Sequence, residues 1–142
     1  MKTPNDLVLY LAGPIAGRTD ADYKTWRKMT ASQWPGKTLD PMRRDYRSIT
    51  IGAEVAAEIV AGDLLDIRNS DALLVYFDQP SVGTSMEVFY AHHVLRKPVF
   101  IINVSGAPLS AWLVHHSTAI FEELTDMTLK QVMQHLVTIF WN

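Results

Sequence analysis

Three polar side chains in otherwise apolar surroundings carry groups suited to acid, base or nucleophilic chemistry. Glu87 follows a glycine-bearing loop, Asp63 lies among apolar residues at helical spacing, and Tyr10 lies inside an apolar, strand-like run. A carboxylate beside a crevice can attack an anomeric carbon and form a glycosyl-enzyme intermediate. A second carboxylate can protonate a leaving base or position water. A buried tyrosine hydroxyl needs a hydrogen-bond partner, and Glu87 is a suitable one.

The two carboxylates also have purely structural interpretations, which the residues alone leave open. Thr84 and Glu87 match the T-x-x-E pattern of a capping box, and a glutamate in the first turn of a helix suits the helix dipole. Asp63 can equally be a half-exposed residue at the edge of a helix, which is what we expect of Asp66.

A glycine loop, G-P-I-A-G-R, follows the first apolar run and begins at Gly13. It matches neither the P-loop nor the dinucleotide-binding pattern. Short glycine loops nevertheless present backbone N–H groups to anions. The donors available here are those of Ile15, Ala16, Gly17 and Arg18. A tight turn between strand and helix is an equally good interpretation.

Two further groups of side chains could bind ligands. Arg43, Arg44 and Arg47 crowd the segment P-M-R-R-D-Y-R, where they suit a phosphate or a stacked base, or simply a solvated turn. Two histidine pairs, 92–93 and 115–116, resemble metal ligands. Adjacent helical side chains point about 100° apart, so neither pair can chelate as a unit, and we expect no metal site. We also expect no cofactor.

Length and composition indicate one globular domain spanning residues 1–142, with a net charge of −2 and no cysteine. Thiol nucleophiles and thiolate metal sites are therefore excluded, and no polybasic surface indicates nucleic-acid binding. The first apolar run is about six residues long, too short for a signal segment or a membrane span. We expect a cytoplasmic protein without a membrane partner.

Strand-like and helix-like segments alternate along the chain. Strands are predicted at residues 7–12, 37–40, 71–77, 98–103 and 119–122. Helices are predicted from a cap within 19–22 to residue 33, and at 51–69, 84–96, 108–116 and 125–140. This alternation predicts an α/β fold, a three-layer αβα sandwich around a five-stranded parallel sheet of flavodoxin- or Rossmann-like order 2-1-3-4-5.

The predicted order places the functional loops together. Ligands of such sheets bind beyond the carboxyl ends of the strands, at the switch point between strands 1 and 3. The loop from Gly13 to Arg18 and the loop at 78–84, which contains Ser81 and Gly83, leave those two ends. We therefore expect both loops to face one crevice, with Glu87 directly after the second.

The order of several segments resembles the nucleoside 2-deoxyribosyltransferase family and its nucleotide N-hydrolase relatives. The segments are L-Y-L-A-G-P-I, G-D-L-L-D-I-R-N-S-D-A-L-L-V, P-S-V-G-T-S-M-E-V-F-Y-A and P-L-S-A-W-L. The resemblance implies that Glu87, in the G-x-x-x-E pattern, is the nucleophile on C1′. It further implies that Asp63 assists base departure or the second step and that Tyr10 orients Glu87.

The resemblance also bears on the 5′ group of the substrate. Transferases of free nucleosides commonly carry an aspartate before V-G that holds the 5′-hydroxyl, whereas this chain carries Ser81. A serine there is similar to the 2′-deoxynucleoside 5′-phosphate N-hydrolases, in which it serves the phosphate. Ser110 similarly resembles the serine that a neighbouring subunit contributes, which implies a homodimer or a higher homo-oligomer. A phosphate prefers hydroxyl and N–H donors and is repelled by a carboxylate.

The sequence therefore predicts an enzyme that cleaves the N-glycosidic bond of a nucleoside 5′-monophosphate and passes the sugar to water or to another base. Two alternatives remain, a 2-deoxyribosyltransferase of free deoxynucleosides and a non-catalytic nucleotide-binding module. Ser81 argues against the first, and the combination of Tyr10, Asp63 and Glu87 argues against the second.

Overall fold

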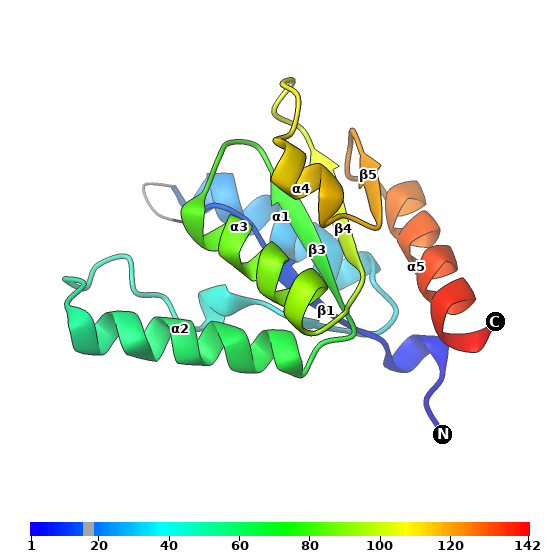
Figure 1. Cartoon of the computed structure of the whole chain (residues 1–142), viewed down its shortest axis with the longest axis horizontal. Helices are drawn as coiled ribbons and strands as arrows, with labels where there is room; N and C mark the ends of the chain where they lie inside the picture. Colours follow the sequence, from blue (N-terminus) through cyan, green and yellow to red (C-terminus); the bar gives the residue numbers. More distant parts are fainter. Residues whose placement is uncertain (16–18) are drawn as a thin grey trace.

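The chain folds around one parallel sheet, as a computed structural model that describes residues 1–15 and 19–142 shows (Figure 1). The strands are β1 (Val8–Ala12), β2 (Lys37–Leu39), β3 (Ala72–Phe77), β4 (Val99–Asn103) and β5 (Ala119–Phe121). Their order is β2-β1-β3-β4-β5 and every neighbouring pair is parallel, which confirms the predicted topology.

Helices cover both faces of the sheet. They are α1 (Asp20–Gln33), α2 (Ala53–Arg68), α3 (Val82–Phe89), α4 (Ala111–His115) and α5 (Asp126–Trp141). Short turns of other helix types are η1 (Pro4–Asp6), η2 (Pro41–Arg43) and η3 (Tyr90–Val94). Helices α1 and α5 pack on one face, while α2, α3 and α4 pack on the other (Figure 1). Within the described residues, no helix combines the length and apolarity needed to cross a membrane.

The central strand β1 divides its side chains between two cores. Leu9 and Leu11 belong to the core under α1 and α5, whereas Tyr10 and Ala12 belong to the core under α2 and α3. Successive side chains of a strand point to opposite faces, so this division follows from the strand geometry. Tyr10 is fully buried. It therefore points toward the helices that carry Asp63 and Glu87.

Helix α3 begins earlier than the sequence predicted, and this changes the interpretation of Glu87. The N-cap is Ser81, whose hydroxyl accepts a hydrogen bond from the Thr84 N–H at 3.3 Å. Thr84 is consequently inside the helix and Glu87 lies in its second turn. The capping-box interpretation of Thr84 and Glu87 is therefore wrong, and the position of Glu87 needs another explanation.

Candidate active site

The candidate site lies where β1 and β3 end side by side. β1 leads into the loop before α1 on one face, and β3 leads into α3 on the other face. Connections that leave neighbouring strands in opposite directions open a crevice at the carboxyl edge of the sheet. Tyr10 and Glu87 come from β1 and α3, and Asp63 comes from α2 on the same face.

Tyr10 and Glu87 are directly hydrogen-bonded. The Tyr10 hydroxyl donates to Oε2 of the half-buried Glu87 side chain in a short contact. Burial raises the pKa of Glu87 to about 8; the hydrogen bond from Tyr10 opposes this rise, and the charge of Asp63 adds to it. At neutral pH the resting Glu87 is thus mostly in its acid form, with a minor fraction present as the carboxylate.

The same contact defines the role of Tyr10. Burial, followed by the charges of Glu87 and Asp63, raises the pKa of Tyr10 well above its ordinary value. The phenol therefore keeps its proton at any physiological pH and acts as a hydrogen-bond donor. A fixed donor holds one carboxyl oxygen of Glu87, Oε2, in place.

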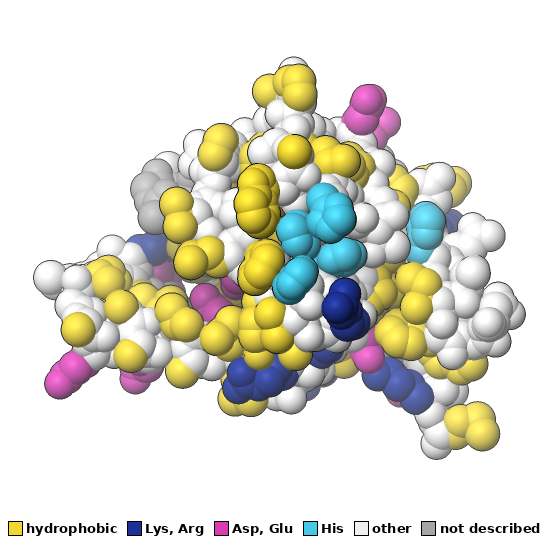
Figure 2. Space-filling view, in the orientation of Figure 1, with side chains coloured by type: hydrophobic (Ala, Val, Ile, Leu, Met, Phe, Trp, Pro, Cys, Tyr) yellow, Lys and Arg dark blue, Asp and Glu magenta, His cyan; other side chains and the backbone are white. Residues whose placement is uncertain are grey.

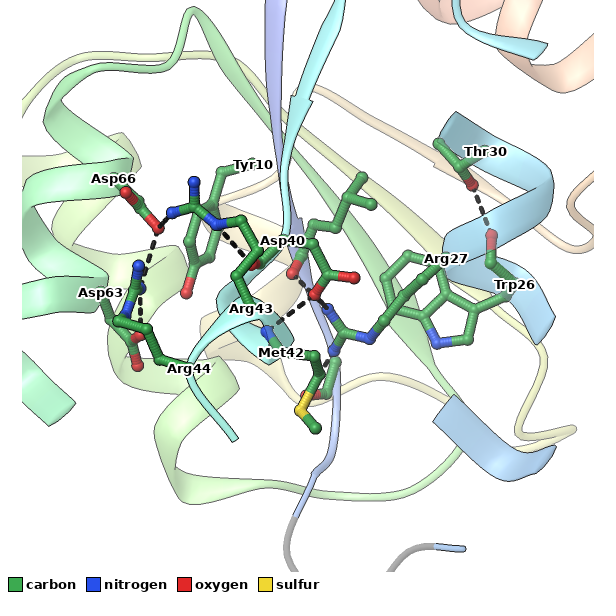
Figure 3. A network of polar contacts seen from close by, with 12 residues as sticks. Tyr10, Trp26, Arg27, Thr30, Asp40, Met42, Arg43, Arg44, Asp63 and Asp66 are labelled. Atoms are coloured by element: carbon green, nitrogen blue, oxygen red, sulfur yellow. Dashed lines mark hydrogen bonds and ion pairs between the residues drawn. The ribbon is translucent and has the colours of Figure 1, made fainter. Parts of the chain in front are cut away.

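Asp63 lies close enough to the pair for its charge to raise the pKa of both Tyr10 and Glu87. Its side chain retains 24% exposure, and its Oδ1 accepts a hydrogen bond from an Arg44 NH2 group at 3.2 Å. Burial raises the pKa of Asp63 and Arg44 lowers it. Figure 3 shows the Tyr10 hydroxyl directed to the side on which Asp63 and Arg44 lie.

Asp66 differs from its prediction as a half-exposed residue, because only 7% of it is exposed. Its Oδ2 accepts hydrogen bonds from Arg43 at 2.5 Å and from Arg44 at 2.8 Å. Two guanidinium groups thus compensate the burial of this carboxylate. The sequence showed no sign of this pairing, because the arginines come from a distant segment.

Arg27 is a residue near the site that sequence reasoning missed. This buried α1 guanidinium donates to the carbonyl of Leu11 at 2.9 Å and to Asp40 Oδ1 at 2.8 Å (Figure 3). Its charge acts on Glu87 and lowers the pKa of that carboxyl. Adjacent Trp26, Arg27 and Lys28 carried no signal that distinguishes a buried arginine from an exposed one.

The glycine loop after β1 is only partly described. Gly13 is buried, and a Cβ atom there would lie 2.9 Å from the Trp26 ring and 3.1 Å from the carbonyl oxygen of Tyr76. Packing therefore explains this glycine. Ile15 is half-buried at the end of the described part. Ala16, Gly17 and Arg18 lie outside the described residues, so anion binding by this loop stays a prediction.

The second loop places Ser81 and Gly83 at the start of α3. Accepting the Thr84 N–H occupies a lone pair of the Ser81 hydroxyl and leaves its proton to be donated. Gly83 is exposed, and a Cβ atom added to it would meet nothing within 4 Å in the described structure. Contact of both residues with a substrate stays a prediction.

Ser110 lies on the outer side of α3, exposed at the N-cap of α4. With Met86, Phe89 and Trp112 it lines an open cavity of about 460 Å³.

Arg43 and Arg47, both predicted to bind substrate, form ion pairs with carboxylates of this chain. Arg43 contacts Asp66, and Arg47 pairs with Asp45 at 2.7 Å and Asp20 at 2.8 Å.

The four histidines of the two pairs gather in one cluster, in which His116 is buried, and the sequence did not predict this. His92 and His116 are 5.4 Å apart between ring centroids, and His115 and His116 are 4.9 Å apart. Figure 2 shows the histidines beside apolar side chains. Among the described residues, no three histidine or acidic side chains are arranged to hold a metal ion.

The chain matches the family model described as nucleoside 2-deoxyribosyltransferase over residues 9–133. The solved 2-deoxyribosyltransferase of Bacillus psychrosaccharolyticus superposes with a TM-score of 0.70 at 18% identity, covering 89% of this chain and 90% of that one. No curated protein matches by sequence.

Two other solved structures share the fold. A conserved protein of Enterococcus faecalis V583 has a TM-score of 0.66 at 12% identity, covering 95% of this chain and 99% of its own. The CMP N-glycosidase BcmB of Clostridium botulinum has a TM-score of 0.52 at 15% identity, with 92% and 98% coverage. At these identities the structural likeness establishes the α/β fold, while the family model carries the relationship.

The raised pKa of Glu87 makes a prediction about stability. In the unfolded chain glutamate ionises near 4.5, whereas the folded protein resists ionisation until about pH 8. Ionisation therefore favours unfolding, and the wild type loses stability as the pH rises from about 4.5 to about 8. Glu87→Gln removes this loss, so the Tm of the variant relative to wild type should rise between pH 5 and pH 8.

The measurement is thermal unfolding of both proteins across that pH range. A Tm difference that stays constant or falls with pH would show that Glu87 is not held in a desolvated position.

Proposed function

Because the chain belongs to the nucleoside 2-deoxyribosyltransferase family, an enzyme family of glycosyl transfer or cleavage, we propose that it cleaves the N-glycosidic bond of a nucleoside 5′-monophosphate. The observation that carries the proposal is the Tyr10–Glu87 hydrogen bond beside Asp63 at the switch point of the sheet. A half-buried carboxyl held by a phenol and adjoining a second carboxylate has little structural use, but it suits attack on a sugar carbon.

In the first step Glu87 reacts as the carboxylate. One of its oxygens forms a bond to C1′ while the C1′–N bond breaks, and the base leaves with the bonding electron pair and takes up a proton. Tyr10 keeps the attacking group oriented throughout. Since the pKa of Glu87 is about 8, the fraction of Glu87 present as the reactive carboxylate increases as the pH rises toward that value.

In the second step an acceptor releases the sugar from Glu87. The acceptor is water in a hydrolase and a second base in a transferase, and its proton must go to a nearby base. Asp63 is the carboxylate whose charge reaches Glu87, and it assists either base departure or this second step.

The 5′-phosphate is proposed to lie at the start of α3. Ser81 offers a neutral hydroxyl there, and the N-terminus of a helix favours an anion. The N–H groups from Ile15 to Arg18 are proposed to reach it across the crevice. A solved structure that shares the fold is a CMP N-glycosidase, and this likeness supports the choice of a nucleoside monophosphate as the proposed substrate.

The protein is further proposed to act as a homodimer with shared sites. The face of α3 and α4 around Ser110 exposes large apolar side chains, with Val82 at 79%, Met86 at 69% and Trp112 at 71% (Figure 2). Contiguous apolar surface of this kind is typical of an interface. A second copy on this face would place its Ser110 at the neighbour's phosphate, as the family resemblance implies.

The proposed chemistry requires Glu87. We expect wild-type protein to release free base from at least one member of a panel of nucleoside 5′-monophosphates and nucleosides, detected by chromatography. Glu87→Gln should lower turnover by about a thousandfold or more while the fold survives, as nucleophile deletions do elsewhere. Wild-type turnover by a folded Glu87→Gln protein would refute the mechanism.

The proposed phosphate site makes a prediction about Ser81. Charge-assisted hydrogen bonds contribute roughly 1.5–3 kcal/mol each, so two of them, after losses to desolvation, favour a monophosphate over its nucleoside by about a hundredfold or more in kcat/KM. Ser81→Asp retains a good helix cap but sets a negative charge against the phosphate, and it should reverse part of this preference.

Ser81→Asn is the matched control, since asparagine caps equally well without a charge. It should keep much more of the preference for the monophosphate than Ser81→Asp does. A wild type that prefers the unphosphorylated nucleoside would remove the phosphate assignment and leave the glycosidic chemistry standing.

Shared sites predict complementation between two inactive variants. Glu87→Gln lacks the nucleophile, and Ser110→Asp keeps the α4 cap while repelling the neighbour's phosphate. A mixed dimer contains one intact site, so after subunit exchange about a quarter of wild-type activity should return. Activity that stays at the level of the separate variants would contradict a site built from two subunits.

A further inference from the structure

The segment from Asp40 to Arg47 has no role in the proposed reaction, yet it is tied firmly to α2. One Arg44 NH2 group contacts Asp63 Oδ1 at 3.2 Å and Asp66 Oδ2 at 2.8 Å (Figure 3). The two aspartates are three residues apart and therefore share one face of the helix. Arg44 bridges a carboxylate next to Glu87 and a buried carboxylate that serves as an anchor.

Gly62 makes this bridge sterically feasible. A Cβ atom at this position would lie 2.9 Å from Nε of Arg44, 3.2 Å from its Cζ and 3.5 Å from its Cδ. The guanidinium thus lies against the backbone of α2. Glycine is unfavourable in the middle of a helix, so a glycine here needs a reason. The close approach of a doubly hydrogen-bonded arginine supplies one.

The bridge controls two properties of Asp63. It restrains the side chain, because a guanidinium held by Asp66 offers its hydrogen from one direction only. It also favours the ionised form, because the Arg44 hydrogen bond and charge lower the pKa of Asp63 against the effect of burial. An ionised carboxylate can accept a proton but cannot donate one.

We propose that Arg44 is a positioning residue that holds the Asp63 carboxylate in place as the base of the second step, and that Gly62 is the glycine that gives Arg44 room. This inference rests on the proposed function and refines it. Arg44 acts through Asp63 and is distinct from the phosphate-binding groups at the start of α3.

The second step then balances as follows. The oxygen of a water molecule bonds to C1′ as the bond between C1′ and Glu87 breaks, and Glu87 recovers its electron pair as a carboxylate. The proton of that water passes to Asp63, which later returns it to solvent. The base that departed in the first step took its own proton from water. In a transferase the incoming base replaces the attacking water.

Other charged or titratable groups surround Asp63, and the test must separate Arg44 from them. They are Asp66 on α2, Arg27 on α1, Glu87 on α3, Tyr10 on β1 and Tyr46 of the same segment as Arg44. Tyr46 provides the control, because it links this segment to α2 through Glu58 Oε2 at 3.0 Å without touching Asp63.

The kinetic test compares Arg44→Met with Tyr46→Phe. Loss of Arg44 should lower kcat by about tenfold to a hundredfold with little change in KM, as loss of precise orientation does. Because only the second step slows, rapid mixing should reveal a burst of about one base per site before the slow phase. Tyr46→Phe should turn over like the wild type.

Gly62→Ala displaces the same guanidinium without removing a charge, and alanine favours the helix. It should lower kcat and produce the same burst. When Gly62→Ala is added to Arg44→Met, kcat should fall no further, since both changes act through one contact. Arg44→Lys should restore part of the activity, because it keeps a cation beside Asp63 but lacks the planar guanidinium whose single NH2 group reaches both aspartates.

A titration that needs no turnover completes the design. The carboxyl carbon of Asp63, assigned from its loss in Asp63→Asn, is followed by NMR from pH 3 to pH 8. The pKa of Asp63 should be higher in Arg44→Met than in the wild type, and closer to the wild type in Arg44→Lys.

Each outcome decides one question. An unchanged Asp63 titration in Arg44→Met, a fall in kcat without a burst, or an increase in KM for the monophosphate alone would overturn this inference. The last result would make Arg44 a substrate ligand. Absence of base release by the wild type would instead overturn the proposed function, and the titration would still test the hold of Arg44 on Asp63.

Discussion

The hydroxyl of Tyr10 reaches Glu87 because β1 turns alternate side chains to opposite faces of the sheet, and the rest of the site depends on this contact. A carboxyl group at the sheet surface loses much of its hydration, and the hydrogen bond from the phenol partly replaces the lost contacts with water. The result is a side chain whose ionisation is deferred to about pH 8. Burial that weakens the fold thus creates a group with the basicity of a good nucleophile.

Charge is distributed unequally over the two helices that face Tyr10. Helix α3 contributes Glu87, whose direct partner is the neutral Tyr10, whereas α2 contributes Asp63 and Asp66, which are bound by arginines. Neighbouring carboxylates with different partners ionise over different pH ranges, which is how two acids in one site take different roles. In the proposed reaction Arg44 and Arg27 therefore act together with the carboxylates whose pKa values they lower.

Exposed apolar side chains are distributed unevenly over the surface of the molecule. Helix α5 leaves Met127 58% and Ile139 47% exposed, whereas α3 and α4 leave Met86 69% and Trp112 71% exposed beside Ser110. A polar residue that the family resemblance assigns to a neighbour thus lies on an apolar surface suited to a neighbour. The proposed reaction and the proposed assembly share this face.

The alternation of strands and helices determined the sheet order, and therefore the neighbouring positions of Gly13, Ser81 and Glu87, because short right-handed connections leave few other arrangements. Family resemblance added the grouping of Tyr10, Asp63 and Glu87. Tertiary contacts decided what spacing within one element cannot express. Asp66 is buried by arginines from another segment, and four histidines from two helical segments meet in one cluster. Each depends on a partner that is distant in the chain, and a local pattern carries no record of it.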